Sequence, residues 1–272
     1  MITTRPAEFS RTPVRNSISA DTGSTPETTR DALLAGKVTL WQPREGYRAA
    51  IDPVMLAAAV EPKAGARLLD LGCGVGAVAL CLLARKAGIT VTGLELDADL
   101  VALARRNAAA NHVEDCLEIH QGSITAPPAD IPPQSFDLVV CNPPYLQAGT
   151  ATASPEPARR SANIEALGDL AAWIAAAARA LKPKGRVAMI HRADRLDRII
   201  SELSDGFGEI TIHPLWPKQG RPAKRVIVQA RKGVSSPARM EAGTVLHTAD
   251  GDYTDTAKAV LEGAGLRALS IL

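Results

Sequence analysis

The stretch ARLLDLGCGVG, residues 66–76, constrains the fold of this 272-residue chain more than any other. An apolar run from Arg67 to Leu71 carries one acid, Asp70, and gives way to glycines at alternate positions before an apolar helical segment. This order predicts a buried strand, a tight turn and a helix N-terminus. Glycines let the backbone approach a ligand closely, and the first N–H groups of a helix attract an anion. The stretch therefore predicts a loop that binds the polar end of a nucleotide-like ligand.

The identity of that ligand depends on Asp70. Gly72, Gly74 and Ala77 also fit the dinucleotide pattern G-x-G-x-x-A, so the loop alone leaves NAD open. A carboxylate just before the first glycine would repel a pyrophosphate but can pair with an ammonium group. S-adenosylmethionine carries an ammonium and a carboxylate and has no phosphate. The residues favour this methyl donor over NAD.

Apolar strands alternate with amphipathic helices along the main body of the chain. Strands are expected at residues 67–71, 90–94, 117–120, 136–141 and 186–190. The helices between them are expected to start at Ala77, at Asp97 or Asp99, and at Asp169, the last one ending at Gly185. This alternation predicts an α/β fold with a mostly parallel, doubly wound sheet.

Further elements are expected at both ends of the chain. Residues 38–41 suggest a short strand, and Asp52-Pro53 suggests an N-cap followed by a helix around residues 55–60. Residues 210–212 and 226–228 suggest a terminal hairpin with one antiparallel strand. Residues 1–30 predict a disordered tail, residues 31–232 the main domain, and residues 233–272 an extension packed on it, with a helix at residues 254–262.

Composition excludes several classes of protein. The formal net charge of +2 gives no global reason to expect nucleic acid, so any such argument needs local clusters of charge. The sequence holds no apolar run of about 18 residues, and no membrane partner is expected. Its four cysteines form no metal-ligand pattern, which predicts reduced core residues in a cytoplasmic protein without a metal.

Glu95 ends the second expected strand, 23 residues after Gly72. A carboxylate at that place can accept hydrogen bonds from both ribose hydroxyls of an adenosyl group. After the third strand, Ser123 lies where adenine would sit. The expected cofactor-binding residues are Asp70, Gly72, Cys73, Gly74, Gly76, Glu95, Leu96, Ser123 and Ile124.

The second anchor is FDLVVCNPPY, in which a buried strand delivers residues 142–145 to the carboxyl edge of the sheet. The amine of a ring or amide is a poor nucleophile because its lone pair is delocalised. The Asn142 side-chain oxygen and the Pro143 carbonyl can each accept one N–H and turn the lone pair toward a methyl donor. Prolines stiffen the loop, and an aromatic ring can stack on a flipped base. The expected catalytic residues are Asn142, Pro143, Pro144 and Tyr145.

DLGCGVG, LELD and NPPY, in this order, resemble the class I S-adenosylmethionine-dependent methyltransferases that act on planar amines. The flanking stretches GYRAAIDPVMLAAAV, IHRADRL and RPAKRVIVQARKG are similar to the bacterial valine-tRNA adenine-N6 methyltransferases. The resemblance implies a Rossmann-like fold, S-adenosylmethionine as cofactor, cofactor contacts from Asp70, Gly72, Gly74 and Glu95, and a target amine held by residues 142–145. One departure is Ser123, where relatives often carry an acid.

Basic residues suggest where a tRNA substrate would bind. Residues 213–232 contain no acid, and another pair of arginines follows the second anchor. The expected substrate contacts are Arg159, Arg160, Lys218, Arg221, Lys224 and Arg225, and the expected rim of the cofactor pocket is Gln42, Tyr47, Arg48 and Asp52. The activity expected is methylation of adenine N6 in tRNA. Alternatives are glutamine N5 methylation of a release factor, guanine N2 methylation of rRNA, an NAD-dependent oxidoreductase and a non-catalytic RNA-binding module.

Overall fold

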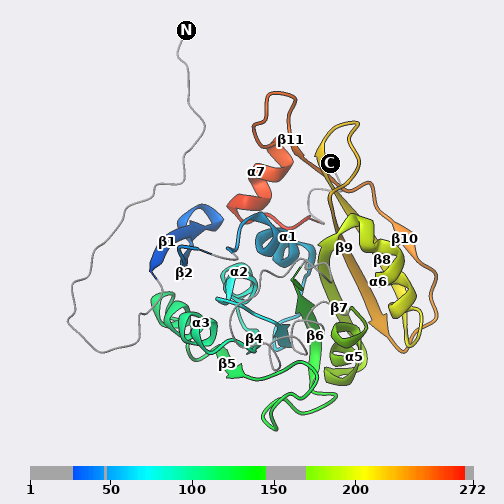
Figure 1. The fold of residues 1–272 in the computed structure, drawn as a ribbon. Coiled ribbons are helices and arrows are strands. Elements are labelled where there is room, and N and C mark those ends of the chain that lie inside the picture. Colours follow the sequence, from blue (N-terminus) through cyan, green and yellow to red (C-terminus); the bar gives the residue numbers. More distant parts are fainter. Residues whose placement is uncertain (1–26, 46–47, 145–169, 267–272) are drawn as a thin grey trace, which may run out of the picture.

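The structure is a computed structural model, and it describes residues 27–45, 48–144 and 170–266. Tyr145, Arg159 and Arg160 lie outside the described residues, as do Tyr47 and Asp169. The elements are arranged around one large twisted sheet with helices on both faces (Figure 1).

Five parallel strands form the centre of this sheet. They are β3 (Arg67–Leu71), β4 (Thr90–Glu95), β5 (Leu117–Gln121), β6 (Phe136–Cys141) and β7 (Leu181–Arg192). Their order across the sheet is β5-β4-β3-β6-β7, so the chain winds one way from β3 to β5 and then the other way from β6 to β7. The expected doubly wound parallel sheet is confirmed, with bounds for β3 and β6 that match the expectation.

Beyond β7 the sheet continues with antiparallel strands. Strand β9 (Arg225–Lys232) pairs antiparallel with both β7 and β8 (Phe207–Lys218), which confirms the expected terminal hairpin. Two short strands of the C-terminal segment, β10 (Arg239–Met240) and β11 (Thr244–His247), pair parallel with β8. The C-terminal segment thereby continues the main sheet.

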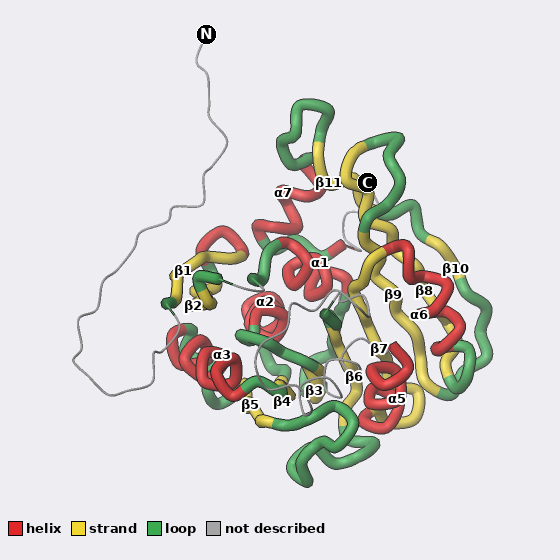
Figure 2. The backbone as a smooth tube through the Cα atoms, viewed as in Figure 1, coloured by secondary structure: helices red, strands yellow, loops and turns green. Residues whose placement is uncertain are grey.

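Helices cover the sheet on both faces (Figures 1 and 2). On one face lie α1 (Ile51–Ala59), α2 (Ala77–Arg85) and α3 (Ala98–Ala110), which share an apolar core with strand residues such as Leu68 and Val91. On the other lie α5 (Leu170–Ala180) and α6 (Leu196–Leu203), which pack on Leu69 and Leu71. Because the side chains of a strand alternate between faces, β3 supplies both cores.

A small antiparallel sheet stands apart from the main one. Strands β1 (Thr28–Leu33) and β2 (Val38–Pro43) are joined by the 3₁₀ turn η1 (Leu34–Gly36) and pack beside α3. β1 begins at Thr28, inside the stretch expected to be a tail. Helix α7 (Asp255–Glu262) confirms the expected C-terminal helix, and Thr254 caps it by accepting from the Ala257 N–H at 3.2 Å. None of the helices described is long and apolar enough to cross a membrane.

Two expected helix boundaries are wrong. Helix α5 ends at Ala180 and β7 begins at Leu181, well before Gly185, because Pro183 lacks an N–H and disfavours helical backbone at the residue before it. Helix α1 begins at Ile51 with Ala50 as its N-cap residue, so Asp52 lies inside the first turn. The Asp52 carboxylate instead pairs with Arg225.

Candidate active site

The carboxyl ends of neighbouring strands bring the two anchor motifs together. Leu71 at the end of β3 pairs with Cys141 on β6 and with Leu94 on β4. Gly72 directly follows β3 and Asn142 directly follows β6. The two residues therefore lie at the same level of the sheet, at the ends of adjacent strands. This is the point where the winding direction reverses, which is where open α/β sheets bind ligands.

Two glycines of the loop after β3 have different surroundings. Both adopt positive φ angles, +63° at Gly72 and +55° at Gly74. A Cβ on Gly72 would lie 2.4 Å from the Trp173 ring, so this buried indole from α5 packs directly beneath the loop. A Cβ on Gly74 would meet nothing within 4 Å. Gly72 thus closes the loop against the core, while Gly74 leaves open space into which a ligand fits.

The rest of the glycine loop contributes backbone. The Cys73 N–H donates to the Leu94 carbonyl at 3.0 Å, and the Cys73 thiol is buried, which raises its pKa. Gly76, at φ +84°, is the N-cap residue of α2 and donates to the Cys73 carbonyl. Of the expected cofactor contacts, Cys73 and Gly76 therefore act by shaping the loop.

Asp70 is a buried acid below the glycine loop. Only 1% of the residue is exposed, and its Oδ2 has no hydrogen-bond partner among the described residues. Burial raises the pKa of Asp70 to about 8; a backbone hydrogen bond from Ala79 opposes the rise and the charge of Glu95 adds to it. An unpaired buried carboxyl oxygen beside an open loop suits the ammonium of an amino-acid end. These residues fit S-adenosylmethionine.

Glu95 ties the second strand end to the glycine loop. Its Oε2 accepts from the Gly74 N–H at 2.8 Å, and its Oε1 accepts from the N–H groups of Leu96 and Asp97 at 2.8 and 2.9 Å. A carboxylate has about four lone-pair sites, so after these three bonds Oε2 retains capacity for about one ribose hydroxyl, where the sequence predicted contacts to both. Leu96 enters the site as a backbone donor to Glu95.

The turn after β5 continues the same edge. The Gly122 N–H donates to the Glu95 carbonyl at 2.8 Å, which places Ser123 next to the end of β4. The Ser123 hydroxyl lies 2.9 Å from the Thr125 hydroxyl, and Ile124 is buried in the core that also contains Leu94. Ser123 thus has a local hydrogen-bond partner beside the expected adenine position.

The second anchor emerges from the strand next to the glycine loop. Cys141 is fully buried at the end of β6, and Asn142 and Pro144 are half-buried with Pro143 buried between them. The half-buried Asn142 amide reaches the sheet edge one strand away from Gly72. The glycine loop and Asn142, side by side at this edge, suit a methyl donor bound on the loop and an acceptor amine bound at Asn142.

The turn between β8 and β9 brings basic residues to this same edge, because β9 starts where β7 ends. Arg225 pairs with Arg192 in the sheet register, and the Ala193 N–H donates to the Lys224 carbonyl at 3.2 Å. Arg221 and Lys224 are exposed. Arg225, by contrast, is half-buried and its Nε lies 3.0 Å from Asp52 Oδ2, and Lys218 Nζ donates to the Ala249 carbonyl. The exposed pair is the part of this turn that is free to meet a phosphate.

Three site-edge residues were not expected from the sequence. Arg192 ends β7 and Arg195 follows it, and the basic letters of IHRADRL at the end of an apolar strand are the signal that could have found them. His191 is buried, and this burial together with the charges of Arg195, Arg192 and Arg225 lowers its pKa to about 4. His191 is therefore neutral at physiological pH.

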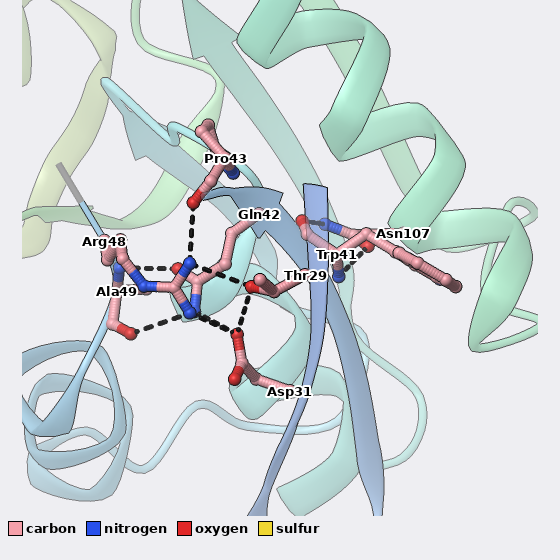
Figure 3. Close-up of polar contacts among 8 residues, drawn as sticks. All are labelled: Thr29, Asp31, Trp41, Gln42, Pro43, Arg48, Ala49 and Asn107. Atoms are coloured by element: carbon pink, nitrogen blue, oxygen red, sulfur yellow. Dashed lines mark hydrogen bonds and ion pairs between the residues drawn. The ribbon is translucent and has the colours of Figure 1, made fainter. Parts of the chain in front are cut away.

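Gln42 and Arg48, two of the expected rim residues, hold the chain before α1 (Figure 3). Gln42 is buried, donates to Asp31 at 2.7 Å and accepts from the Ala49 N–H at 2.8 Å. Arg48 donates to Asp31, Thr29 and the Pro43 carbonyl at 2.7–2.8 Å. These contacts connect the small sheet to the start of α1.

Comparison with known proteins gives a consistent result. Residues 51–213 match the family described as methyltransferase small domain. A tRNA1(Val) (adenine(37)-N6)-methyltransferase from Aeromonas hydrophila is 31% identical over 206 residues, 75% of this chain and 84% of that protein. A protein of the same name from Porphyromonas gingivalis is 37% identical over 55% of this chain and 60% of that protein.

Solved structures share the fold. A predicted O-methyltransferase from Agrobacterium tumefaciens superposes with a TM-score of 0.65 at 24% identity, over 78% of this chain and 96% of that one. The 16S rRNA N2 G1207 methyltransferase of T. thermophilus, in complex with AdoMet and guanosine, gives a TM-score of 0.50 at 25% identity, over 78% of this chain and 46% of that one.

Proposed function

Because this chain belongs to the methyltransferase small domain family, we propose that it methylates N6 of an adenine in tRNA. The chain is an S-adenosylmethionine-dependent methyltransferase, and what we propose is the identity of the group that accepts the methyl. Support for the adenine comes from the Aeromonas hydrophila relative, whose name gives adenine N6 in a tRNA as its target. A cytoplasmic location belongs to the same proposal. The observation that carries it is the register of Leu71 with Cys141, which sets Gly72 beside Asn142.

The chemistry follows from that placement. The bound cofactor supplies a methyl group on a positively charged sulfur. Asn142 Oδ1 and the Pro143 carbonyl accept the two N–H groups of the target amine, which draws its lone pair out of conjugation and fixes its direction. Methyl transfer from the bound cofactor to the amine nitrogen would be followed by loss of one proton from that nitrogen to solvent. Asn142 and Pro143 thus contribute by positioning the amine and by stabilising the positive charge that develops on it.

A second acceptor is favoured by one comparison. The T. thermophilus neighbour is named for guanine N2 of rRNA, which is also an amine on a planar ring. The Asn142 and Pro143 acceptors suit either base. Glutamine N5 of a protein offers the same planar geometry but would not need the exposed cations of the β8–β9 turn.

Those cations give the test of an RNA substrate. Replacing Arg221 and Lys224 by alanine is expected to weaken tRNA binding and to flatten the plot of log affinity against log salt by about 0.7–0.9 per lost phosphate contact. The matched control is Lys63→Ala, because Lys63 is exposed but precedes β3 at the opposite edge of the sheet. Fluorescence anisotropy with tRNA over a salt series measures both slopes.

A wild-type protein that methylates a release-factor peptide and binds tRNA with no salt dependence would contradict the RNA proposal. An equal loss of slope in Lys63→Ala would place the RNA elsewhere on the surface.

A further inference from the structure

Two asparagines, one in α3 and one at its C-cap, pair with the free edge of β2 as a neighbouring strand would. The Trp41 N–H donates to Asn107 Oδ1 at 2.7 Å, and Asn107 Nδ2 donates back to the Trp41 carbonyl at 2.8 Å (Figure 3). One helical turn later, Asn111 makes the same two bonds with the backbone of Thr39, at 2.8 and 2.7 Å. Each amide therefore replaces one rung of a β-ladder.

The two asparagines differ in their third hydrogen bond. Asn107 is fully buried, and its Nδ2 also donates to the Val75 carbonyl at 2.9 Å, inside the glycine loop. Asn111 Nδ2 instead donates to the Asn107 carbonyl, in the last turn of α3. Of this pair, only Asn107 touches the loop that receives the cofactor.

The Val75 carbonyl belongs to a peptide plane that is fixed at both ends. Its oxygen accepts from Asn107, and the N–H of the same peptide, that of Gly76, donates to the Cys73 carbonyl at 2.8 Å. This plane lies between Gly74, which faces open space, and the first turn of α2. A rotation of the plane would turn a carbonyl oxygen toward the carboxylate of the ligand and misalign the N–H groups that follow.

We infer that Asn107 is a positioning residue of the cofactor site, which couples the order of the β1–β2 sheet to the conformation of the glycine loop. Asn107 touches neither cofactor nor substrate in this role. It keeps the Val75 carbonyl directed away from the ligand, and it does so only while its other two bonds hold Trp41. The inference depends on the cofactor and is independent of the identity of the methyl acceptor.

Asn107→Ala and Asn111→Ala separate this role from a structural one. Both variants lose two bonds to β2, so both are expected to lower the melting temperature and to raise hydrogen exchange in the β1–β2 sheet. Only Asn107→Ala leaves a loop carbonyl unpaired, and it is expected to weaken S-adenosylhomocysteine binding by roughly tenfold in calorimetry, while Asn111→Ala stays within about twofold. Equal affinities in the two variants would overturn the inference.

A second measurement needs no variant and covers the case in which Asn107→Ala does not fold. In the wild-type protein, S-adenosylhomocysteine is expected to slow exchange of the Trp41 amide, which donates to Asn107, much more than that of the Thr39 amide, which donates to Asn111. Equal slowing of both amides, or of neither, would overturn the coupling.

Discussion

An Asn142→Ala enzyme is expected to bind S-adenosylmethionine within a few-fold of wild type and to turn over about 10²–10³ times more slowly. The loss falls on turnover because Asn142 follows β6, whereas the proposed cofactor contacts lie at the ends of β3 and β4. Calorimetry gives the affinity, and single-turnover methylation at saturating cofactor gives the rate.

Asn142→Asp is the matched control for this prediction. It keeps an acceptor oxygen of the same size and adds a charge that attracts the sulfonium and the developing positive amine. Partial methylation activity in Asn142→Asp with almost none in Asn142→Ala would support the role of Asn142 as a hydrogen-bond acceptor. If both variants reached the wild-type rate with cofactor saturating, the NPPY segment would be a turn without a catalytic role.

The affinity for S-adenosylmethionine is expected to rise roughly tenfold per pH unit from pH 6 toward pH 8, and then to level off. Burial holds the pKa of Asp70 near 8, so the cofactor-free site binds a proton at pH 6. The ammonium of the cofactor favours the carboxylate, so binding releases that proton. The same shift affects folding without cofactor. The protonated Asp70 carboxyl contributes fully to the stability of the fold below the ordinary pKa of 3.8, and this contribution is lost as the pH rises from 3.8 through 8.

Two controls isolate Asp70 in this experiment. Asp70→Asn has the same size and does not titrate, so its cofactor affinity is expected to be flat over this pH range. Methylthioadenosine lacks the amino-acid end, so its affinity for the wild-type protein is also expected to be flat. A pH dependence that survives in Asp70→Asn would assign the titration to another group.

The sequence alone predicted the parts of the fold that depend on local order. The strands before the glycine loop and before NPPY match the structure at both ends, because each is an apolar run that a glycine or proline segment stops. The doubly wound parallel sheet was predicted from the alternation of apolar strands with amphipathic helices along the chain. Asp70, Gly72, Glu95 and Asn142 lie at one sheet edge because parallel strands present their carboxyl ends together; their role as a site stays a prediction.

Contacts between distant segments could not be predicted in this way. Asp52 reads as an N-cap from its neighbours, but Arg225, 173 residues away, takes its carboxylate. The sequence predicted Gln42 and Arg48 at the rim of the cofactor pocket, but in the structure their hydrogen bonds hold the chain before α1. The amides of Asn107 and Asn111 pair with the free edge of the β1–β2 sheet, and a sequence pattern does not show that pairing.

Asn107 and Asn111 did leave a signal that could have been used. Asparagine is unfavourable within a helix because its side chain competes for backbone hydrogen bonds. Asn107 inside α3, with Asn111 four residues later at its C-cap, therefore indicates that this side of the helix contacts backbone from elsewhere. The identity of that backbone, Thr39 and Trp41, required the structure.

Mass spectrometry of tRNA nucleosides tests the central claim most directly. tRNA from a strain that lacks this gene is expected to lose one N6-methyladenine, to regain it with the wild-type gene, and to remain without it when the complementing copy carries Asn142→Ala. An unchanged N6-methyladenine content in the deletion strain, with loss of N2-methylguanine from rRNA or of methylglutamine from a release factor, would contradict it.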